Sequence, residues 1–274
     1  MHSISAYAKI NIFLEILGKR SDGYHLLNSL FVSIGLHDEL SAFEHEGLIC
    51  EMYDQYGRRL VIENNIIYKA AIKLQEATGI KSGAYISVKK NIPVAAGLAG
   101  GSTDAAATLR ALNILWQCGL DDFQLMQIGL SLGADVPFCI HGGAAQVSGI
   151  GEQISQTKIH EKIHLLIVNN GTQLLTKDVF KHLSAKDFSA PKPFPTTIAQ
   201  IAERKNDLES TSITLEPSIG NVLSMISNLD GCMFARMSGS GPTCFGVFKD
   251  EIYLQNSIQN LPKSWFIYTE SLFI

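Results

Sequence analysis

The sequence lacks the features of membrane proteins and of small secreted domains. Nowhere do eighteen apolar residues run together, as a transmembrane helix requires. The first residues, Met1 to Ser5, have neither the basic nor the apolar region of a signal peptide. The five cysteines are an odd number, widely spaced and without a C-x-x-C pair, which does not fit a disulfide framework. We therefore expect a cytoplasmic protein with reduced thiols and no membrane partner.

An excess of positive charge is also missing. Lysine and arginine number 22 against 26 aspartates and glutamates, and the formal net charge is −4. This balance argues against nucleic acid as the main partner, and the sequence indicates no protein partner. With 274 residues, 46% of them hydrophobic, the chain can fill the core of one large domain or of two ordinary ones. Any anion-binding site must be local.

A stretch rich in glycine at residues 91–107 connects two predicted elements. It follows a strand-like segment at 84–88 and leads into an alanine-rich run that predicts a helix through Leu115. Ser102 or Thr103 can serve as the N-cap of this helix. The order is therefore strand, glycine loop, helix.

The glycines of this loop, Gly97, Gly100 and Gly101, let the main chain approach a ligand closely and adopt positive φ. The first N–H groups of the helix point back over them, which favours a phosphate chain as the occupant. The positions of these glycines fit neither the P-loop motif G-x-x-x-x-G-K-[ST] nor the dinucleotide-binding motif G-x-G-x-x-G. A tight loop with ordinary helix capping is the alternative.

An alternating pattern at residues 6–16 predicts a half-buried strand. On its polar side Lys9 and Asn11 project together, about 7 Å apart along the strand. A single lysine on a strand is usually solvated. A turn at 18–23 follows, and its Asp-Gly pair is typical of a hairpin.

Tyr24 and His25 follow this turn directly. Taken alone, they are best explained as a tyrosine packed at the end of the hairpin beside an exposed histidine. On these residues alone, that explanation is preferred to a functional role.

Asp135 lies in the stretch 133–138, which breaks a helix predicted to begin at Asp122. Because its neighbours are apolar and Pro137 follows closely, the carboxylate is either a turn residue or a partly desolvated base. The next segment, 142–152, predicts a strand. We expect a domain boundary near its end.

His160 and His164 spell H-E-x-x-H, the zinc-protease motif. That chemistry requires both imidazoles one helical turn apart. Here His164 leads into a run typical of a buried strand at 165–168, and a strand separates the two residues by about 13 Å. We therefore interpret the motif as a coincidence.

The remaining elements are less distinctive. The patterns predict weak strands at 41–62, a helix capped by Asn64 and Asn65 that ends at Gly79, helices at 174–183, 197–204 and 216–228, and a strand at 231–236. Residues 184–197 contain three prolines and predict an ordered surface loop or a mobile segment.

Four parts of the chain resemble the motifs of the GHMP small-molecule kinases. Residues 93–107 are similar to the second motif, the phosphate loop, and 237–246 to the third. The stretch 133–152, which contains G-A-D-V-P-F, also resembles the corresponding part of these kinases. Residues 8–25 resemble the first motif of one branch, whose substrate carries a cytidine diphosphate group. Ala99 stands where many members have glycine, which is tolerable if its φ stays negative.

The resemblance implies an α+β fold of two lobes with the active site in the cleft between them. The N-terminal lobe at 1–152 would be like the second domain of ribosomal protein S5, and the C-terminal lobe at 153–274 ferredoxin-like. Asp135 would be the catalytic base, with Lys9 orienting it. Mg²⁺ would contact Ser102. The residues implied for ATP are Asn65, Lys90, Pro93, Gly97, Leu98, Ala99, Gly100, Gly101, Ser102 and Thr103. Those implied for the cytidine-bearing substrate are Asn11, Tyr24, His25, Thr176 and Phe180.

Three other functions compete with this interpretation. A kinase for another small alcohol, such as homoserine or mevalonate, fits less well because of the hairpin at 22–25. A catalytically inactive nucleotide-binding regulator would not need both Lys9 and Asp135. A zinc protease would need the histidine motif on a helix.

Overall fold

The computed structural model describes residues 2–61, 65–157 and 159–274. The chain folds into two compact units, neither of which is continuous in sequence. The first unit comprises Met1–Ala8, Gly35–Pro93 and Ala99–Gly142; the second comprises Lys9–Ile34, Val94–Leu98 and Gly143–Ile274. This division by contacts differs from a single cut near residue 152, and the lobes at 1–152 and 153–274 stay a prediction.

Two long strands supply residues to both units. Strand β1 (His2–Lys19) pairs with β2 (His25–His45), and the turn between them has Gly23 at φ 94°. The predicted hairpin is therefore confirmed. Its strands are longer than the alternating stretch from which it was predicted.

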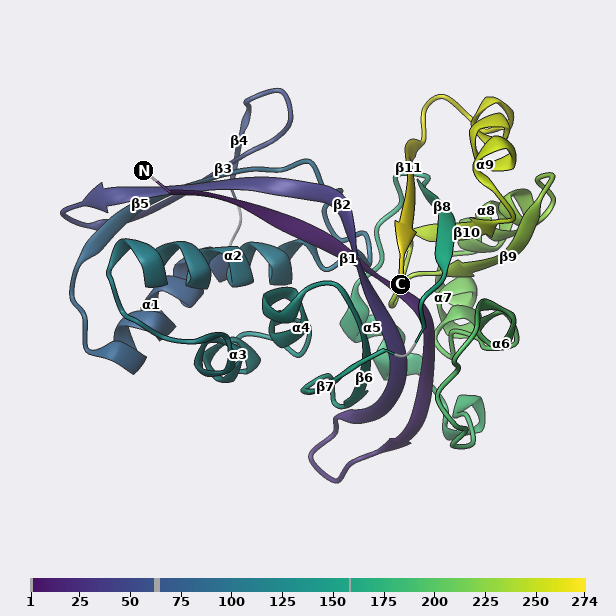
Figure 1. Ribbon diagram of the computed structural model, residues 1–274, viewed down its shortest axis with the longest axis horizontal. Helices are drawn as coiled ribbons and strands as arrows, with labels where there is room; N and C mark the ends of the chain where they lie inside the picture. Colours follow the sequence, from purple (N-terminus) through teal and green to yellow (C-terminus); the bar gives the residue numbers. More distant parts are fainter. Residues whose placement is uncertain (1, 62–64, 158) are drawn as a thin grey trace. The chain divides into compact units, whose positions relative to one another are not determined.

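The first unit is a sheet covered by helices. Strand β5 (Gly83–Lys89) pairs antiparallel with the second half of β2 and parallel with β3 (Leu48–Tyr53). Strand β3 in turn pairs antiparallel with the short β4 (Arg59–Leu60). Four helices lie on one face of this sheet (Figure 1): α1 (Ile66–Thr78), α2 (Gly100–Leu115), α3 (Asp122–Leu130) and α4 (Val136–His141). Alanines of α2 are fully buried, so this helix packs closely against its neighbours.

The second unit contains the predicted ferredoxin-like arrangement. Its antiparallel sheet has the order β11 (Phe266–Phe273), β8 (Lys162–Asn169), β10 (Cys244–Phe248), β9 (Cys232–Met237). With α8 (Ser218–Ser227) before β9 and α9 (Glu251–Ser257) after β10, the order is β-α-β-β-α-β. A short pair, β6 (Ala144–Gly149) and β7 (Gln153–Gln156), joins the first half of β2.

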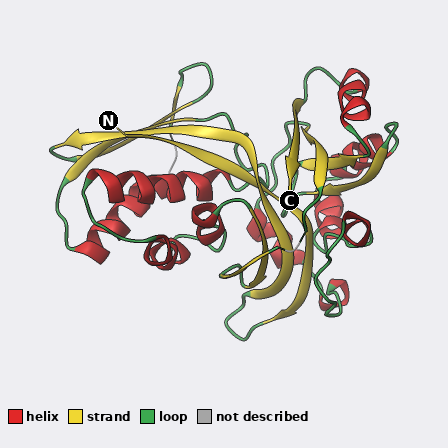
Figure 2. Cartoon of the chain, in the orientation of Figure 1, coloured by secondary structure: helices red, strands yellow, loops and turns green. Residues whose placement is uncertain are grey.

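The region between β8 and β9 holds short helices joined by loops; Figure 2 draws helices in red and loops in green. They are α5 (Thr176–His182), η1 (Ala185–Asp187), α6 (Ile198–Ala202) and α7 (Glu209–Leu215). Helix α7 was not predicted, because it is brief and has no regular apolar stripe. No helix in the described part of the chain is long and apolar enough to cross a membrane.

The prediction of a half-buried strand at 6–16 holds for Tyr7, which is 51% exposed, but is wrong for the rest of its polar side. Lys9, Asn11 and Glu15 are 3%, 1% and 1% exposed. Segments distant in sequence cover this side; for example, Arg204 Nη1 donates to Glu15 Oε1 at 3.0 Å. Alternation alone does not distinguish solvent from a polar protein environment.

Candidate active site

The predicted site residues are divided between the two units. The first unit holds Asn65, Lys90, Pro93, Ala99, Gly100, Gly101, Ser102, Thr103 and Asp135. The second unit holds Lys9, Asn11, Tyr24, His25, Gly97, Leu98, Thr176 and Phe180. Within each unit these residues gather around a few elements.

The helix after the glycine loop begins earlier than predicted. Helix α2 starts at Gly100, and its N-cap is Ala99, not Ser102 or Thr103. Thr103 N–H already donates to the carbonyl of Ala99 at 2.9 Å. Ala99 has φ 58°, so the condition of a negative φ is not met, and the alanine adopts a conformation that is costly for L-residues. The first N–H groups of a 16-residue helix thus lie at 100–102, within the glycine loop.

Within the first unit, the start of α2 lies close to the stretch that carries Asp135. A Cβ added to Gly133 would be 4.0 Å from Ser102 Oγ. Asp135 is half-buried at the N-cap position of α4, and its side chain makes no capping hydrogen bond. The carboxylate is therefore not used to begin the helix, which fits the interpretation as a partly desolvated base.

In the second unit, Gly97 packs against the third glycine motif. It has φ 75°, and an added Cβ would lie 2.6 Å from the carbonyl oxygen of Ser238 and 2.7 Å from that of Gly241. Ser238 Oγ donates to the carbonyl of Gly97 at 3.1 Å. Only glycine fits there, because both the conformation and the space exclude a side chain.

Replacing Gly97 by alanine is expected to lower the free energy of unfolding by more than about 1 kcal/mol, because the backbone must move from positive φ and from two carbonyls. Thermal unfolding without nucleotide measures the effect. The matched control is Gly101→Ala, where the nearest atom to the added Cβ, Ile66 Cγ2, is 3.9 Å away. Equal melting temperatures for the two variants would contradict this packing.

Lys9 and Asn11 form a buried polar group in the second unit. Lys9 Nζ donates to Asn11 Oδ1 at 2.7 Å and lies 4.2 Å above the centre of the Phe31 ring. Asn11 Nδ2 donates to Ser29 Oγ at 3.1 Å, and Asn11 N–H to Ser238 Oγ at 3.3 Å. A buried ammonium needs such partners, so the solvated lysine that β1 alone would suggest is excluded.

Asn65 has the structural role that its position predicts and also borders a pocket. Its Oδ1 accepts from Ile67 N–H at 2.9 Å and so caps α1; Asn64 lies outside the described residues. A pocket of about 440 Å³ is lined by Cys50, Glu51, Met52, Arg59, Leu60, Val61, Asn65, Tyr68 and Lys69. Its mixed lining, next to the residue expected near adenine, suits a flat polar base.

Lys90 is a buried residue rather than the solvated end of a strand. Its Nζ forms ion pairs with Asp38 and, at 2.6 Å, with Asp104. Asp38 Oδ1 also accepts the N–H groups of Asn91 at 2.6 Å and Ile92 at 2.8 Å. These contacts tie the end of β5 to the first turns of α2. If Lys90 contributes to adenine binding, it does so while its ammonium is paired with Asp38 and Asp104.

Two carboxylates around one ammonium leave a surplus negative charge in this triad. Asp104 Oδ1 is buried and has no hydrogen-bond partner among the residues that the structure describes. Burial and the nearby charge of Asp38 raise the pKa of Asp104 to about 7, although Lys90 opposes the shift. Asp104 therefore keeps its proton to a higher pH than an ordinary carboxyl does.

Of the residues expected at the cytidine pocket, the structure brings His25 and Phe180 into contact within the second unit. The rings of His25 and Phe180 are 5.1 Å apart at 35°, and Thr176 Oγ1 hydrogen-bonds with Ser240 Oγ at 2.8 Å. Tyr24, which directly precedes His25 in sequence, is 56% exposed. Burial, and then the charge of Lys19, lower the pKa of His25, which favours a neutral imidazole with one donor and one acceptor nitrogen.

Sequence reasoning missed several residues that support this site. Phe188 packs edge-on against His25, with ring centres 5.9 Å apart. Asn206 Nδ2 donates to the carbonyls of Met237 at 2.8 Å and Gly239 at 2.7 Å, which holds the third glycine motif. The adjacent Asn206 and Asp207 between two predicted helices were the only sequence signal, and it is equally typical of an ordinary turn.

The two histidines of the H-E-x-x-H motif do not lie on one helix. His160 lies in a loop and His164 in β8, where its ring hydrogen-bonds with Ser271 Oγ at 2.7 Å. Among the residues that the structure describes, no group of three or more His, Cys, Asp or Glu is arranged to hold a metal. The helical context required for a zinc protease is absent from 160–164, as predicted.

Comparison with known families agrees with the motifs. The sequence matches the family described as GHMP kinases N terminal domain over residues 65–143 and the one described as GHMP kinases C terminal over 192–266. The chain belongs to the GHMP kinases. Their matched regions contain the glycine loop, the Asp135 stretch and the third motif, so this GHMP kinase is a phosphotransferase.

Relatives extend the match over almost the whole chain. A 4-diphosphocytidyl-2-C-methyl-D-erythritol kinase of Parvibaculum lavamentivorans is 43% identical and covers 90% of this chain and 89% of its own. A crystal structure of 4-(cytidine 5'-diphospho)-2C-methyl-D-erythritol kinase superposes with a TM-score of 0.82 at 30% identity, with 99% of each chain covered. The mevalonate kinase of Methanococcus jannaschii gives a TM-score of 0.71 at 13% identity over 100% of this chain and 98% of its own, which shows a shared fold alone.

Proposed function

We propose that this GHMP kinase transfers the γ-phosphoryl group of ATP to the 2-hydroxyl of 4-diphosphocytidyl-2-C-methyl-D-erythritol, a step of non-mevalonate isoprenoid precursor biosynthesis. The observation that carries the choice of substrate is the packing of His25 on Phe180, next to the exposed Tyr24. Aromatic faces with a neutral imidazole suit a nucleobase. The relative that is 43% identical acts, by its name, on the same compound class.

In the proposed reaction Asp135 accepts the proton of the 2-hydroxyl as its oxygen attacks the γ-phosphorus. Lys9 orients this carboxylate and stabilises the negative charge that develops on the oxygen. Asn11 fixes the Lys9 ammonium through the 2.7 Å hydrogen bond. Phosphoryl transfer depends mainly on positioning and electrostatics, so few side chains need act chemically.

The chain offers suitable groups for ATP. Residues 97–103 would hold the phosphates, because a glycine that admits no Cβ and the N-terminus of α2 both belong to this loop. The pocket beside Asn65 would hold the adenine. Mg²⁺, when bound, neutralises phosphate charge and needs only one or two protein ligands, so Ser102 fits as its contact.

Two rival functions make different demands on the same residues. A homoserine or mevalonate kinase acts on a substrate without a base and has no use for the ring cluster at His25. A nucleotide-binding regulator has no use for a half-buried Asp135 that does not cap its helix. We also propose that the enzyme is cytoplasmic and that its substrate is its main partner.

Tyr24→Ala should raise KM for the cytidine-bearing substrate by about 5- to 150-fold, since one aromatic–base stack contributes about 1–3 kcal/mol. Initial rates measured against each substrate give this value. Wild type should phosphorylate free methylerythritol phosphate far less well than the cytidine-bearing compound. Tyr253→Ala, in α9, is the control and should resemble wild type. Equal rates on both substrates would overturn the proposed base recognition.

A further inference from the structure

The segment at 184–197, between α5 and α6, is held in place by two buried acidic residues. It contains three prolines and, apart from the 3₁₀ turn η1, no regular structure. Such a segment loses conformational entropy when it is ordered, so its fixation requires specific contacts. All of these contacts lie within the second unit.

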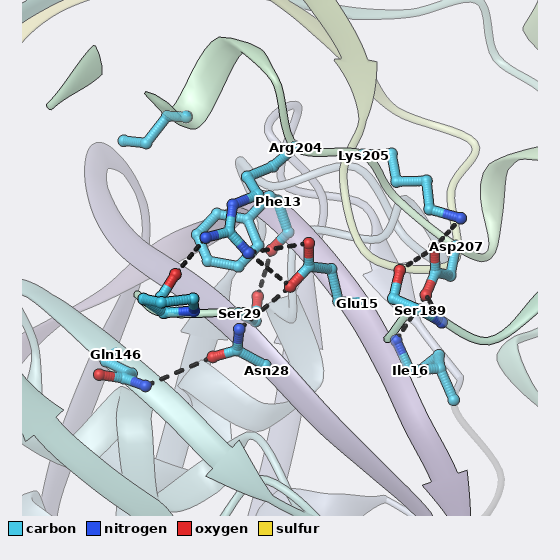
Figure 3. A network of polar contacts seen from close by, with 12 residues as sticks. Phe13, Glu15, Ile16, Asn28, Ser29, Gln146, Ser189, Arg204, Lys205 and Asp207 are labelled. Atoms are coloured by element: carbon cyan, nitrogen blue, oxygen red, sulfur yellow. Dashed lines mark hydrogen bonds and ion pairs between the residues drawn. The ribbon is translucent and has the colours of Figure 1, made fainter. Parts of the chain in front are cut away.

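Asp207 provides the first attachment point. Its side chain is fully buried and accepts Ile16 N–H at 2.7 Å and Lys205 Nζ at 2.9 Å. It also accepts from Ser189, through the backbone N–H at 3.1 Å and through Oγ at 3.0 Å. Ser189 N–H additionally donates to the carbonyl of Ile16 at 2.8 Å. Hydrogen bonds to a carboxylate are strong, so Ser189 is fixed to β1 (Figure 3).

Glu15 provides the second attachment point through Arg204. The guanidinium donates from Nη1 to both carboxylate oxygens at 3.0 Å, and its Nη2 donates to the carbonyl of Pro193. Both side chains are almost completely buried, and Asn28 Nδ2 also donates to Glu15, at 3.1 Å. Phe194 then packs on Phe13, with ring centres 5.6 Å apart. Figure 3 shows Arg204 between Glu15 and the Phe13 ring.

Phe188 directly precedes Ser189, the residue that Asp207 holds, and its ring contacts a residue of the proposed pocket. It meets the His25 ring edge-on, at 85° with 5.9 Å between centres. His25 also contacts Phe180, with ring centres 5.1 Å apart. The imidazole therefore contacts two phenyl rings, whereas the χ2 torsion of an isolated histidine has a broad preference. Contacts of this kind restrict the rotation of the imidazole ring.

We propose that residues 184–197 form a strap whose role is to hold Phe188 against His25, and that Phe188 is a positioning residue for recognition of the cytosine base. This rests on the proposed function, because it assigns His25 to the base. The imidazole contacts the substrate, and Phe188 acts only through it. An edge-to-face aromatic pair is a suitable device, since it restricts a ring without occupying its hydrogen-bonding nitrogens.

The test uses the full-length enzyme and separates the two substrates. Phe188→Ala should raise KM for the cytidine-bearing substrate about 2- to 12-fold, the equivalent of one lost aromatic pair, with kcat and KM for ATP unchanged. Phe188→Tyr keeps the ring edge and should restore the wild-type KM. Ser189→Ala removes one hydrogen bond to Asp207 and should raise the same KM by a smaller factor. Phe123→Ala, an exposed phenylalanine of α3, is the control.

Calorimetric titration with CDP distinguishes failure of the strap from failure of the function. Wild type that binds no CDP would overturn the proposed function. Wild type and Phe188→Ala that bind CDP equally would overturn only the strap. A fall in kcat or a higher KM for ATP, without a change in CDP affinity, would show that Phe188 is merely structural. If Phe188→Ala does not fold, Phe188→Leu takes its place, with the same outcomes.

Discussion

Replacing Asp135 by asparagine is expected to lower kcat by about 10²- to 10⁴-fold, the usual contribution of a general base. The amide keeps the size of the side chain but accepts no proton at neutral pH. Asp135 starts α4 without capping it, so the substitution should leave the helix intact. Initial rates of ADP release measure kcat, and titration with a non-hydrolysable ATP analogue checks that ATP binding persists.

Lys9→Ala should lower kcat by about 10²-fold or more while ATP still binds, because Lys9 would no longer orient Asp135 or stabilise the attacking oxygen. The matched control for Asp135→Asn is Asp122→Asn, which alters a carboxylate that is 57% exposed and paired with Arg110. It should retain wild-type kcat. Wild-type turnover in either the Asp135 or the Lys9 variant would refute the assigned mechanism.

Replacing Lys90 by methionine is expected to lower the free energy of unfolding by about 3–5 kcal/mol. The substitution keeps an apolar chain of similar length but leaves Asp38 and Asp104 buried without their counter-charge. The neighbouring Lys89→Met is the control, since its pair with Glu39 is about half exposed and contributes about 0–1 kcal/mol. Urea unfolding of both variants provides the comparison. Equal losses would show that the triad contributes no more than a surface pair.

The pH dependence of stability tests the same triad. The pKa of Asp104 is raised to about 7 in the folded protein from an ordinary value of 3.8, so folding takes up a proton between these values. Its contribution to stability is therefore present at low pH and is lost as pH rises from about 4 to about 7. Asp104→Asn keeps an acceptor for Lys90 and removes the titration. The free energy of unfolding of wild type, relative to this variant, should fall between pH 5 and 7. A constant difference would contradict the assignment.

Patterns that repeat locally predicted most elements of the fold. The apolar stripe of α1, the hairpin of β1 and β2 and the strand at β8 depend on neighbours in sequence, and the structure confirms them. The start of α2 at Gly100 was missed, because a capping serine or threonine is usually preferred to an alanine at positive φ. Such a conformation is imposed by the surroundings and not by the residue.

Contacts between distant segments could not be predicted in the same way. Asp104 was assigned no role, since only folding brings Lys90 and Asp38 around it. Phe188 was hidden in a proline-containing segment that the sequence left open as ordered or mobile. Its position depends on Asp207, which is 19 residues away in sequence. The burial of Lys9 likewise depends on chain segments that alternation cannot reveal.

The most direct test of the central claim is ADP release by the purified wild-type enzyme with ATP and Mg²⁺, measured with three alcohols in parallel. We predict turnover with 4-diphosphocytidyl-2-C-methyl-D-erythritol, with the new phosphate on its 2-hydroxyl by phosphorus NMR, and far slower turnover with mevalonate and homoserine. Comparable or faster turnover of mevalonate or homoserine, or no turnover of the cytidine-bearing alcohol, would contradict the account.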